Sequence, residues 1–261
     1  MNSPMKICKL NLFIFCLILA HCISEHSTII STFNDGPKID DSGLSDSLKN
    51  LYKIDATLLA VREIWEINNS YCDSIEIPDK MIKFYYHRLI AIYNDSIIPA
   101  TDSVTTLFPI HTRDSLKLTS ICIAFDNSFS WVDSFINTGN TKFNTSFDSL
   151  IQKYQLRILH NLSIINVVVF HSDKPLNMRA LGERFLKIPG IRYTHPDAAL
   201  DGNDITAIRN SSNVLFTFSL GWGDCPNGCI WRRFWDIKVQ DDYSIVYLGS
   251  YGASLKDWVH W

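Results

Sequence analysis

The chain has 261 residues, and its 24 lysine and arginine residues against 27 aspartate and glutamate residues give a formal net charge of −3. A hydrophobic fraction of 46%, with 12% aromatic residues, excludes an intrinsically disordered chain. Acidic and basic residues are interspersed and form no basic face, so we expect no nucleic-acid partner.

The N-terminus has the three-part pattern of a secretory signal. Lys6 and Lys9 precede an apolar run from Leu10 to Ala20, and small and polar residues follow it. The run is too short to span a bilayer comfortably and fits export instead. We therefore expect residues 1–22 to be a signal peptide and the mature protein to act in the cell envelope or outside the cell.

The end of this signal has two interpretations. Leu19, Ala20, His21 and Cys22 resemble the lipobox of bacterial lipoproteins, in which the cysteine carries a lipid anchor. His21 departs from that pattern, which has a small residue at this position. Cleavage after Cys22 or Ser24 by the ordinary signal peptidase fits equally well. A lipid anchor through Cys22 and an unanchored mature chain therefore both stay open.

Four cysteines follow the signal, namely Cys72, Cys122, Cys225 and Cys229. An even number of cysteines in an exported chain favours disulfides over free thiols. Proximity in the sequence favours a Cys225–Cys229 disulfide, which leaves Cys72–Cys122 as a weaker second pairing.

The N-terminal part of the mature chain is expected to be a tether followed by a helical hairpin. Residues 23–44 are polar with little periodicity, as in a tether. Residues 45–118 contain two runs of apolar residues at spacings of three and four, which are Leu51, Ile54, Leu58, Val61 and Trp65, then Met81, Tyr85, Leu89 and Ile92. Pro78 suits the first position of the second helix, and residues 95–117 are expected to be mostly loop.

Residues 119–200 alternate strand and helix patterns in the order β-α-β-β-α-β, which is the ferredoxin-like arrangement. The expected elements are a strand at 121–125, helices at 130–136 and 147–154, two strands in 156–172 with a turn near Asn161, a helix at 176–188 and a strand at 191–195.

Two stretches of this segment, "FDSLIQKYQL" and "VVVFHSDKPLNMRALGERFLKIPGIRYTHPD", resemble the prodomains of subtilisin-type proteases. The resemblance implies a ferredoxin-like fold and inhibition or chaperoning of a protease, with the segment Thr194 to Leu200 in the protease cleft. The chain departs from that family because only residues 201–261 follow, which leaves no room for a catalytic protease domain.

Residues 201–261 are expected to form an antiparallel β-meander. Val214, Phe216, Phe218 and Leu220 alternate with other residues as in a strand, and further strands are expected at 229–239 and 244–248. The whole chain is therefore predicted to be an α+β protein with an α-hairpin, a ferredoxin-like unit and a C-terminal meander.

The stretch "GWGDCPNGC", residues 221–229, is predicted to be a hairpin closed by a disulfide. Proline, asparagine and glycine at 226–228 suit a three-residue loop, which would place Cys225 opposite Cys229 at a distance that a disulfide can bridge. This register places Trp231 opposite Gly223, Trp235 opposite Ser219, Arg232 opposite Trp222 and Phe234 opposite Leu220. Large side chains would thus cover small ones on one face, and Arg232 would stack on the indole of Trp222 on the other.

The string "GWGDCPNGCIWRRFW" also resembles a signature of uncharacterised exported bacterial proteins, in which a helical part, the "DKPLN…IPGIRY…P" unit and a "GDCPxGC" hairpin occur together. The match runs from about residue 50 to the end. It implies architecture and export, and it implies no activity.

Cofactor and metal chemistry are not expected. The cysteine spacing is not the C-x-x-C of redox sites, and His171, His195 and His260 have no zinc-ligand spacing with the cysteines. The "DGND" stretch, Asp201 to Asp204, offers oxygens that suit Ca²⁺, but it has no glutamate at the twelfth position of an EF-hand loop. We interpret it as a turn with capping side chains.

The leading functional expectation is a non-catalytic binding or protease-inhibitor-like module with a protein or peptide partner. The candidate binding residues are Trp222, Asp224, Arg232, Arg233 and His195. The alternative is a hydrolase with a site near the 221–235 hairpin. A cleft that gathers several of these side chains would favour the enzyme, and an exposed sheet edge would favour the binding module.

Overall fold

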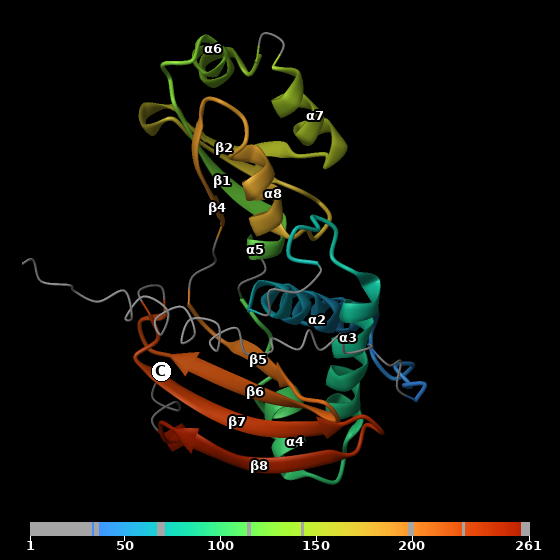
Figure 1. The fold of residues 1–261 in the computed structure, drawn as a ribbon. Coiled ribbons are helices and arrows are strands. Elements are labelled where there is room, and N and C mark those ends of the chain that lie inside the picture. Colours follow the sequence, from blue (N-terminus) through green and yellow to red (C-terminus); the bar gives the residue numbers. More distant parts are fainter. Residues whose placement is uncertain are drawn as a thin grey trace, which may run out of the picture. The chain divides into compact units, whose positions relative to one another are not determined.

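The computed structural model describes residues 33, 37–66, 71–113, 116–141, 144–197, 201–225 and 228–256. All of them belong to one compact unit of the chain, Phe33–Trp261 (Figure 1). The expected signal peptide, Cys22 and most of the tether lie outside the described residues. None of the helices described is long and apolar enough to cross a membrane.

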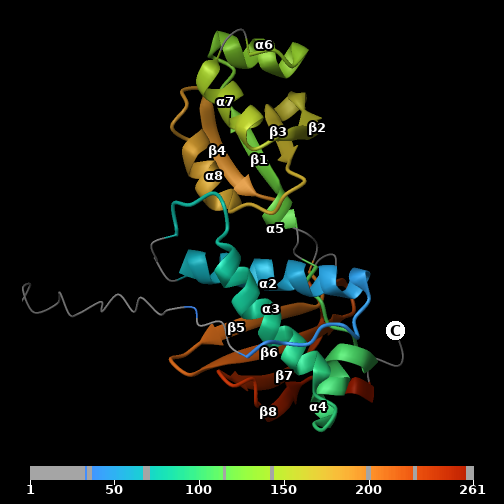
Figure 2. The same cartoon turned by 90° about the vertical axis from the view of Figure 1, so that its right-hand side faces the viewer.

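The expected helical hairpin is present as α2 (Asp46–Glu66) and α3 (Asp79–Asn94). Pro78 caps α3 from the position before its first residue, where an extended φ of −63° and ψ of 123° suits proline. The buried stripe of α3 includes Met81, Tyr85 and Leu89, as the spacing predicts. Both helices pack on one face of the C-terminal sheet, which Figure 2 shows from the side.

The segment expected to be mostly loop, 95–117, is more regular than its prolines suggest. It contains the short helix α4 (Pro99–Asp102), a π-helical turn (Ser103–Leu107) and the start of α5 (Leu116–Thr119). Pro99 occupies the first turn of α4, where its missing N–H costs nothing. The proline therefore begins a helix here instead of breaking one.

The ferredoxin-like unit is confirmed by the strand order β2-β3-β1-β4, in which all neighbouring strands are antiparallel. Its elements are β1 (Ser120–Phe125), α6 (Ser130–Thr138), α7 (Thr145–Lys153), β2 (Arg157–Leu162), β3 (Val167–His171), α8 (Met178–Phe185) and β4 (Ile191–Pro196). The turn between β2 and β3, expected near Asn161, is a 3-10 turn at Ser163–Ile165 followed by Asn166 with a φ of 54°. We call this sheet the first sheet.

One face of the first sheet is covered by its helices, and the other is not. Ile121, Ile123 and Phe125 of β1 form a core with buried residues of α6, α7 and α8. Because side chains alternate along a strand, Cys122 and Ala124 lie on the opposite face, where they are half-buried.

The C-terminal meander has four strands in the order β5-β6-β7-β8, which we call the second sheet. They are β5 (Asp204–Arg209), β6 (Asn213–Trp222), β7 (Trp231–Gln240) and β8 (Ile245–Gly252). β5 was not expected, because Asp204 was assigned to a turn. Residues of β6 and β7 that face α2 and α3 form the main core, including Phe216, Phe218, Trp235 and Ile237.

The predicted register of the β6–β7 hairpin is wrong by one residue. The structure pairs Trp222 with Trp231, Ser219 with Phe234, and Phe218 with Trp235. The strands end at Trp222 and Trp231, so the connection is longer than a three-residue loop and does not set the register. Burial of Trp235 beside Phe218 in the core decides it, because a slip of one residue would turn one strand's apolar side chains away from α2 and α3.

The Cys225–Cys229 disulfide is present, with a Cα–Cα distance of 3.9 Å, but both cysteines lie in the connection and not in paired strands. The second expected pairing is wrong, because Cys72 and Cys122 are both free thiols. Cys122 lies within β1, where the alternation of the strand directs it to the helix-free face.

Candidate functional site

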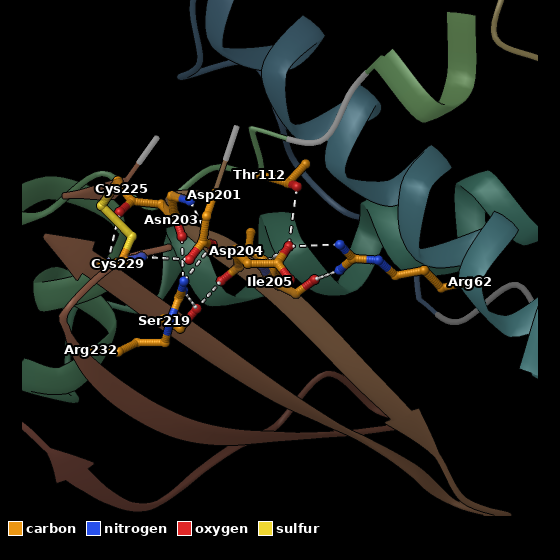
Figure 3. Close-up of polar contacts among 12 residues, drawn as sticks. Arg62, Thr112, Asp201, Asn203, Asp204, Ile205, Ser219, Cys225, Cys229 and Arg232 are labelled. Atoms are coloured by element: carbon orange, nitrogen blue, oxygen red, sulfur yellow. Dashed lines mark hydrogen bonds and ion pairs between the residues drawn. A yellow bond between two sulfur atoms is a disulfide. The ribbon is translucent and has the colours of Figure 1, made fainter. Parts of the chain in front are cut away.

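A polar hollow of about 420 Å³ lies at one end of β5, β6 and β7, and we call it the Arg232 hollow (Figure 3). The antiparallel register brings its parts together, because Asp204 pairs with Ser219 and Ser219 pairs with Phe234. Its lining residues are Arg62, Thr112, Arg113, Lys117, Asp201, Gly202, Asn203, Asp204, Thr206, Thr217, Ser219, Arg232 and Phe234.

Arg232 is the centre of a hydrogen-bond network in this hollow. Its Nη1 donates to the carbonyl of Gly202 at 2.8 Å and to Ser219 Oγ at 2.9 Å, and its Nη2 donates to Asp201 Oδ1 at 2.6 Å (Figure 3). A planar guanidinium with several fixed donors suits this branched set of acceptors. Arg232 therefore ties the segment after the first sheet to β6 and β7.

Asp201 joins this network to the disulfide loop. Its Oδ2 accepts a hydrogen bond of 2.8 Å from the backbone N–H of Cys229, and its Oδ1 accepts one from the N–H of Gly202. Partial burial alone would raise the pKa of Asp201, but the N–H of Cys229 and the guanidinium of Arg232 outweigh that effect and lower it below 3.8. The carboxylate is therefore held in its charged form.

Gly221 provides the space in which the disulfide packs. A Cβ at Gly221 would lie 2.5 Å from Cys229 Sγ and 3.1 Å from Cys229 Cβ. The backbone N–H of Gly221 also donates to Asn203 Oδ1 at 3.2 Å. Gly221 is thus explained by the close approach of the disulfide, whereas a Cβ at Gly223 would lie 3.2 Å from Cε3 of Trp231, the tryptophan expected beside it.

A second ion pair closes the other end of the hollow. Arg62 of α2 lies 2.9 Å from Asp204 Oδ1 and donates to the carbonyl of Ile205 at 2.6 Å. Asp204 Oδ1 also accepts a hydrogen bond from Thr112 Oγ1 at 3.1 Å. Arg62 therefore links α2 to the first residues of β5 (Figure 3).

Beside this pair lies a buried contact between Asp55 and His111, which was not predicted from the sequence. Oδ2 of Asp55, on α2, is 2.6 Å from Nδ1 of His111, and Oδ1 of Asp55 accepts from the N–H of Thr112. Burial raises the pKa of Asp55, although the hydrogen bond from His111 acts in the opposite direction. Asp55 is buried on α2, and its signal in the sequence is an acidic residue four positions after Leu51 and three before Leu58, within the apolar spacing of the helix.

The side chains of the "DGND" turn face protein donors, as the capping interpretation predicts. Asp201 accepts from Arg232 and Cys229, Asn203 accepts from Gly221, and Asp204 accepts from Arg62 and Thr112. Across the described ranges, no group of three or more histidine, cysteine or acidic side chains is arranged to hold a metal ion.

The five predicted binding residues are not brought together. Trp222 is only 5% exposed and belongs to the core, and Arg233 follows Arg232 on β7 and so points to the opposite face of the sheet. Asp224 is exposed in the loop between β6 and β7. His195 lies on β4 of the first sheet, where its ring stacks on Tyr193. Only Arg232 lines the hollow.

A different exposed feature lies at the edge of the first sheet, and we call it the β2 edge. Every residue of β2 is exposed, and β2 is the outermost strand of the sheet on its side. Large apolar side chains in β2 and the following turn are open to solvent, and they are Ile158, Leu159, Leu162, Ile164 and Ile165. Ile164 is 98% exposed. An exposed apolar edge strand of this kind is a ready template for pairing with another chain.

Comparisons with protein-family models, with curated proteins and with solved structures find no match to this chain. The resemblances to protease prodomains and to the exported proteins with a "GDCPxGC" hairpin therefore stay predictions from the sequence.

Proposed function

We propose that this protein is an exported, non-catalytic binding module of the protease-inhibitor type, and that its β2 edge binds the partner protein. The observation that carries the proposal is the full exposure of β2 at the edge of a ferredoxin-like sheet, together with its apolar side chains. An extended segment of a partner can add to such an edge through backbone hydrogen bonds, while side-chain contacts set specificity.

The exposed apolar side chains favour a macromolecular partner. Isolated apolar residues on a surface are ordinary, but these five are consecutive or nearly so along one edge and one turn. Natural edge strands are usually protected by charge, proline or a covering loop. β2 has a bulge between Ile158 and His160 and carries Arg157, yet its apolar side chains stay exposed, which favours a binding surface.

The hydrolase alternative has less support. Arg232 and Arg233 point to opposite faces of β7, and Asp201, which contacts Arg232, has its pKa lowered by hydrogen bonds. A general acid or base needs a proton that it can exchange near neutral pH. The Asp201 carboxylate instead serves as a fixed acceptor for Arg232.

The likeness to protease prodomains suggests a subtilisin-type protease as the partner, but the mode of contact differs from the one first expected. Thr194, His195 and Pro196 pair with β1 as part of β4, and Asp201 is held by Arg232. Residues 198–200 lie outside the described residues. The β2 edge, and not the segment Thr194 to Leu200, is therefore the proposed contact.

The test is inhibition of a subtilisin-type protease by the full chain at micromolar concentration. We expect the wild-type chain to slow hydrolysis of a small chromogenic substrate. The double substitution Leu162→Asp, Ile164→Asp should weaken inhibition at least tenfold, because it places charge on the β2 edge. Ile208→Asp is the matched control, because Ile208 is 65% exposed on β5 of the second sheet.

Equal weakening by Ile208→Asp would show that the β2 edge is not the contact. Cleavage of the wild-type chain without any slowing of the protease, across a panel of subtilisin-type enzymes, would overturn the proposal.

A further inference from the structure

The lining of the Arg232 hollow is positively charged once its internal ion pairs are considered. Arg232 neutralises Asp201, and Arg62 neutralises Asp204. Arg113 also lines the hollow, and no carboxylate among the described residues pairs with its guanidinium. An unpaired arginine beside two neutral pairs favours an anionic group in the hollow.

Arg113 is placed over the floor of the hollow by a glycine. A Cβ at Gly202 would overlap with the Cδ atom of Arg113, so only glycine lets the arginine stem lie across this turn. The backbone N–H of Arg113 donates to the carbonyl of Asn203 at 3.3 Å, and this hydrogen bond fixes the backbone of Arg113 beside the turn. The stem of Arg113 therefore lies against the Gly202 turn, and Arg113 lines the hollow.

The opposite wall offers an aromatic surface. Phe234 lines the hollow and stacks on Tyr251 of β8, with ring centroids 5.0 Å apart and an interplanar angle of 16°. Tyr251 is half exposed. Stacking on Tyr251 holds the Phe234 ring in place, and the ring face turned away from Tyr251 is a flat apolar surface that suits the apolar face of a sugar ring.

Three residues with hydroxyl groups, Thr206, Thr217 and Ser219, also line the hollow. Thr206 and Thr217 are paired neighbours on β5 and β6, and Ser219 follows on the same face of β6. The Oγ1 of Thr217 donates to Asp236 at 2.7 Å, which leaves its oxygen as an acceptor for a ligand hydroxyl. A volume of about 420 Å³ is within the range of small-molecule sites.

We propose that the Arg232 hollow binds a small carboxylated sugar of the uronic acid type. The carboxylate pairs with Arg113, the sugar ring lies against Phe234, and the sugar hydroxyls hydrogen-bond with the threonine-lined strands. This site lies on the second sheet, and the proposal is independent of the β2 edge.

The test is titration of the full chain with glucuronate, glucose and inorganic phosphate, followed by isothermal calorimetry or ligand-observed NMR. We expect glucuronate to bind at least tenfold more tightly than glucose and than phosphate. Arg113→Met, which keeps the apolar stem, should weaken glucuronate binding at least tenfold. Arg192→Met is the matched control, because Arg192 is an exposed arginine on β4 of the first sheet.

Phe234→Leu separates a sugar site from a simple anion site. It removes the flat ring and should weaken glucuronate binding while leaving the affinity for phosphate unchanged. Binding of phosphate as tight as that of glucuronate, or glucose as tight as glucuronate, would overturn the proposed ligand class. Absence of glucuronate binding at millimolar concentrations in a folded wild-type chain would overturn the site. Neither result bears on protease inhibition, which the β2-edge variants test.

Discussion

At the scale of single residues, the glycines of the C-terminal part determine where the disulfide and Arg113 can lie. Gly221 leaves space for Cys229 Sγ, and Gly202 leaves space for the stem of Arg113. The side chains that meet these two glycines differ in stiffness. The disulfide beside Gly221 is held at both ends, whereas the arginine stem beside Gly202 can rotate. Gly221 is therefore the less replaceable of the two.

Gly221→Ala is expected to lower the free energy of unfolding by about 1–3 kcal/mol, as in other overpacked sites. The added methyl would lie 2.5 Å from Cys229 Sγ, and the disulfide cannot rotate away from it. Gly43→Ala is the control and should be near neutral, because nothing lies within 4 Å of a Cβ there. Urea denaturation measures both, and equal effects of the two substitutions would contradict the packing account.

Asp201 is expected to make stability depend on pH. Its pKa is lowered in the folded chain, so the contribution of its charged form is present above the unfolded value of 3.8 and is lost as the pH falls through the folded value. Asp201→Asn should lower the Tm near pH 7, and the difference from wild type should shrink as the pH falls below 3.8. A difference in Tm that stays constant between pH 7 and pH 3 would show that the charge of Asp201 does not contribute.

At the scale of elements, a buried ion pair joins α2, α3 and β5. Glu63 of α2 accepts hydrogen bonds from Arg209 of β5 and from the hydroxyl of Tyr85 on α3, the latter at 2.8 Å. The guanidinium of Arg209 also lies 4.5 Å from the ring centroid of Phe33. Glu63 and Tyr85 are buried and Arg209 is partly buried, so their mutual contacts compensate for lost hydration.

Glu63→Ala is expected to cost about 3 kcal/mol of stability, because it removes the buried carboxylate that accepts hydrogen bonds from Arg209 and Tyr85. The control is Asp173→Ala, which removes an exposed pair with Arg157 and should cost no more than about 1 kcal/mol. Chemical denaturation of both variants measures the difference. If both variants lost the same small amount of stability, water would reach Arg209 and the Glu63–Arg209 pair would not join the three elements.

At the scale of the whole molecule, the proposed binding role depends on export. The basic, apolar and polar parts of residues 1–22 predict that this segment is absent from the mature protein. We expect the envelope-associated protein to begin at or shortly after Cys22, which mass spectrometry of its N-terminus measures. A diacylated Cys22 would establish the lipid anchor, a start at Ile23 or Glu25 would establish ordinary cleavage, and an intact Met1 would contradict export.

The order of helices and strands could be predicted from the sequence because it depends on local periodicity. Apolar spacings of three and four placed α2 and α3, and alternation placed β1, β6 and β7. The ferredoxin-like order follows from these elements, since few arrangements of β-α-β-β-α-β bury one face of a sheet. The Cys225–Cys229 disulfide was also predictable, because the two residues are close in the sequence.

The register of β6 with β7 and the make-up of the Arg232 hollow were decided by the tertiary structure. The register depends on which face meets α2 and α3, and the turn residues carry no information about that face. The hollow joins Arg62 of α2, Thr112, the turn at Asp201 and Arg232 of β7, which are distant in the sequence. Side chains at such separations meet only when burial of apolar surface packs their elements together, so local patterns identified Arg232 as polar and exposed but could not identify its partners.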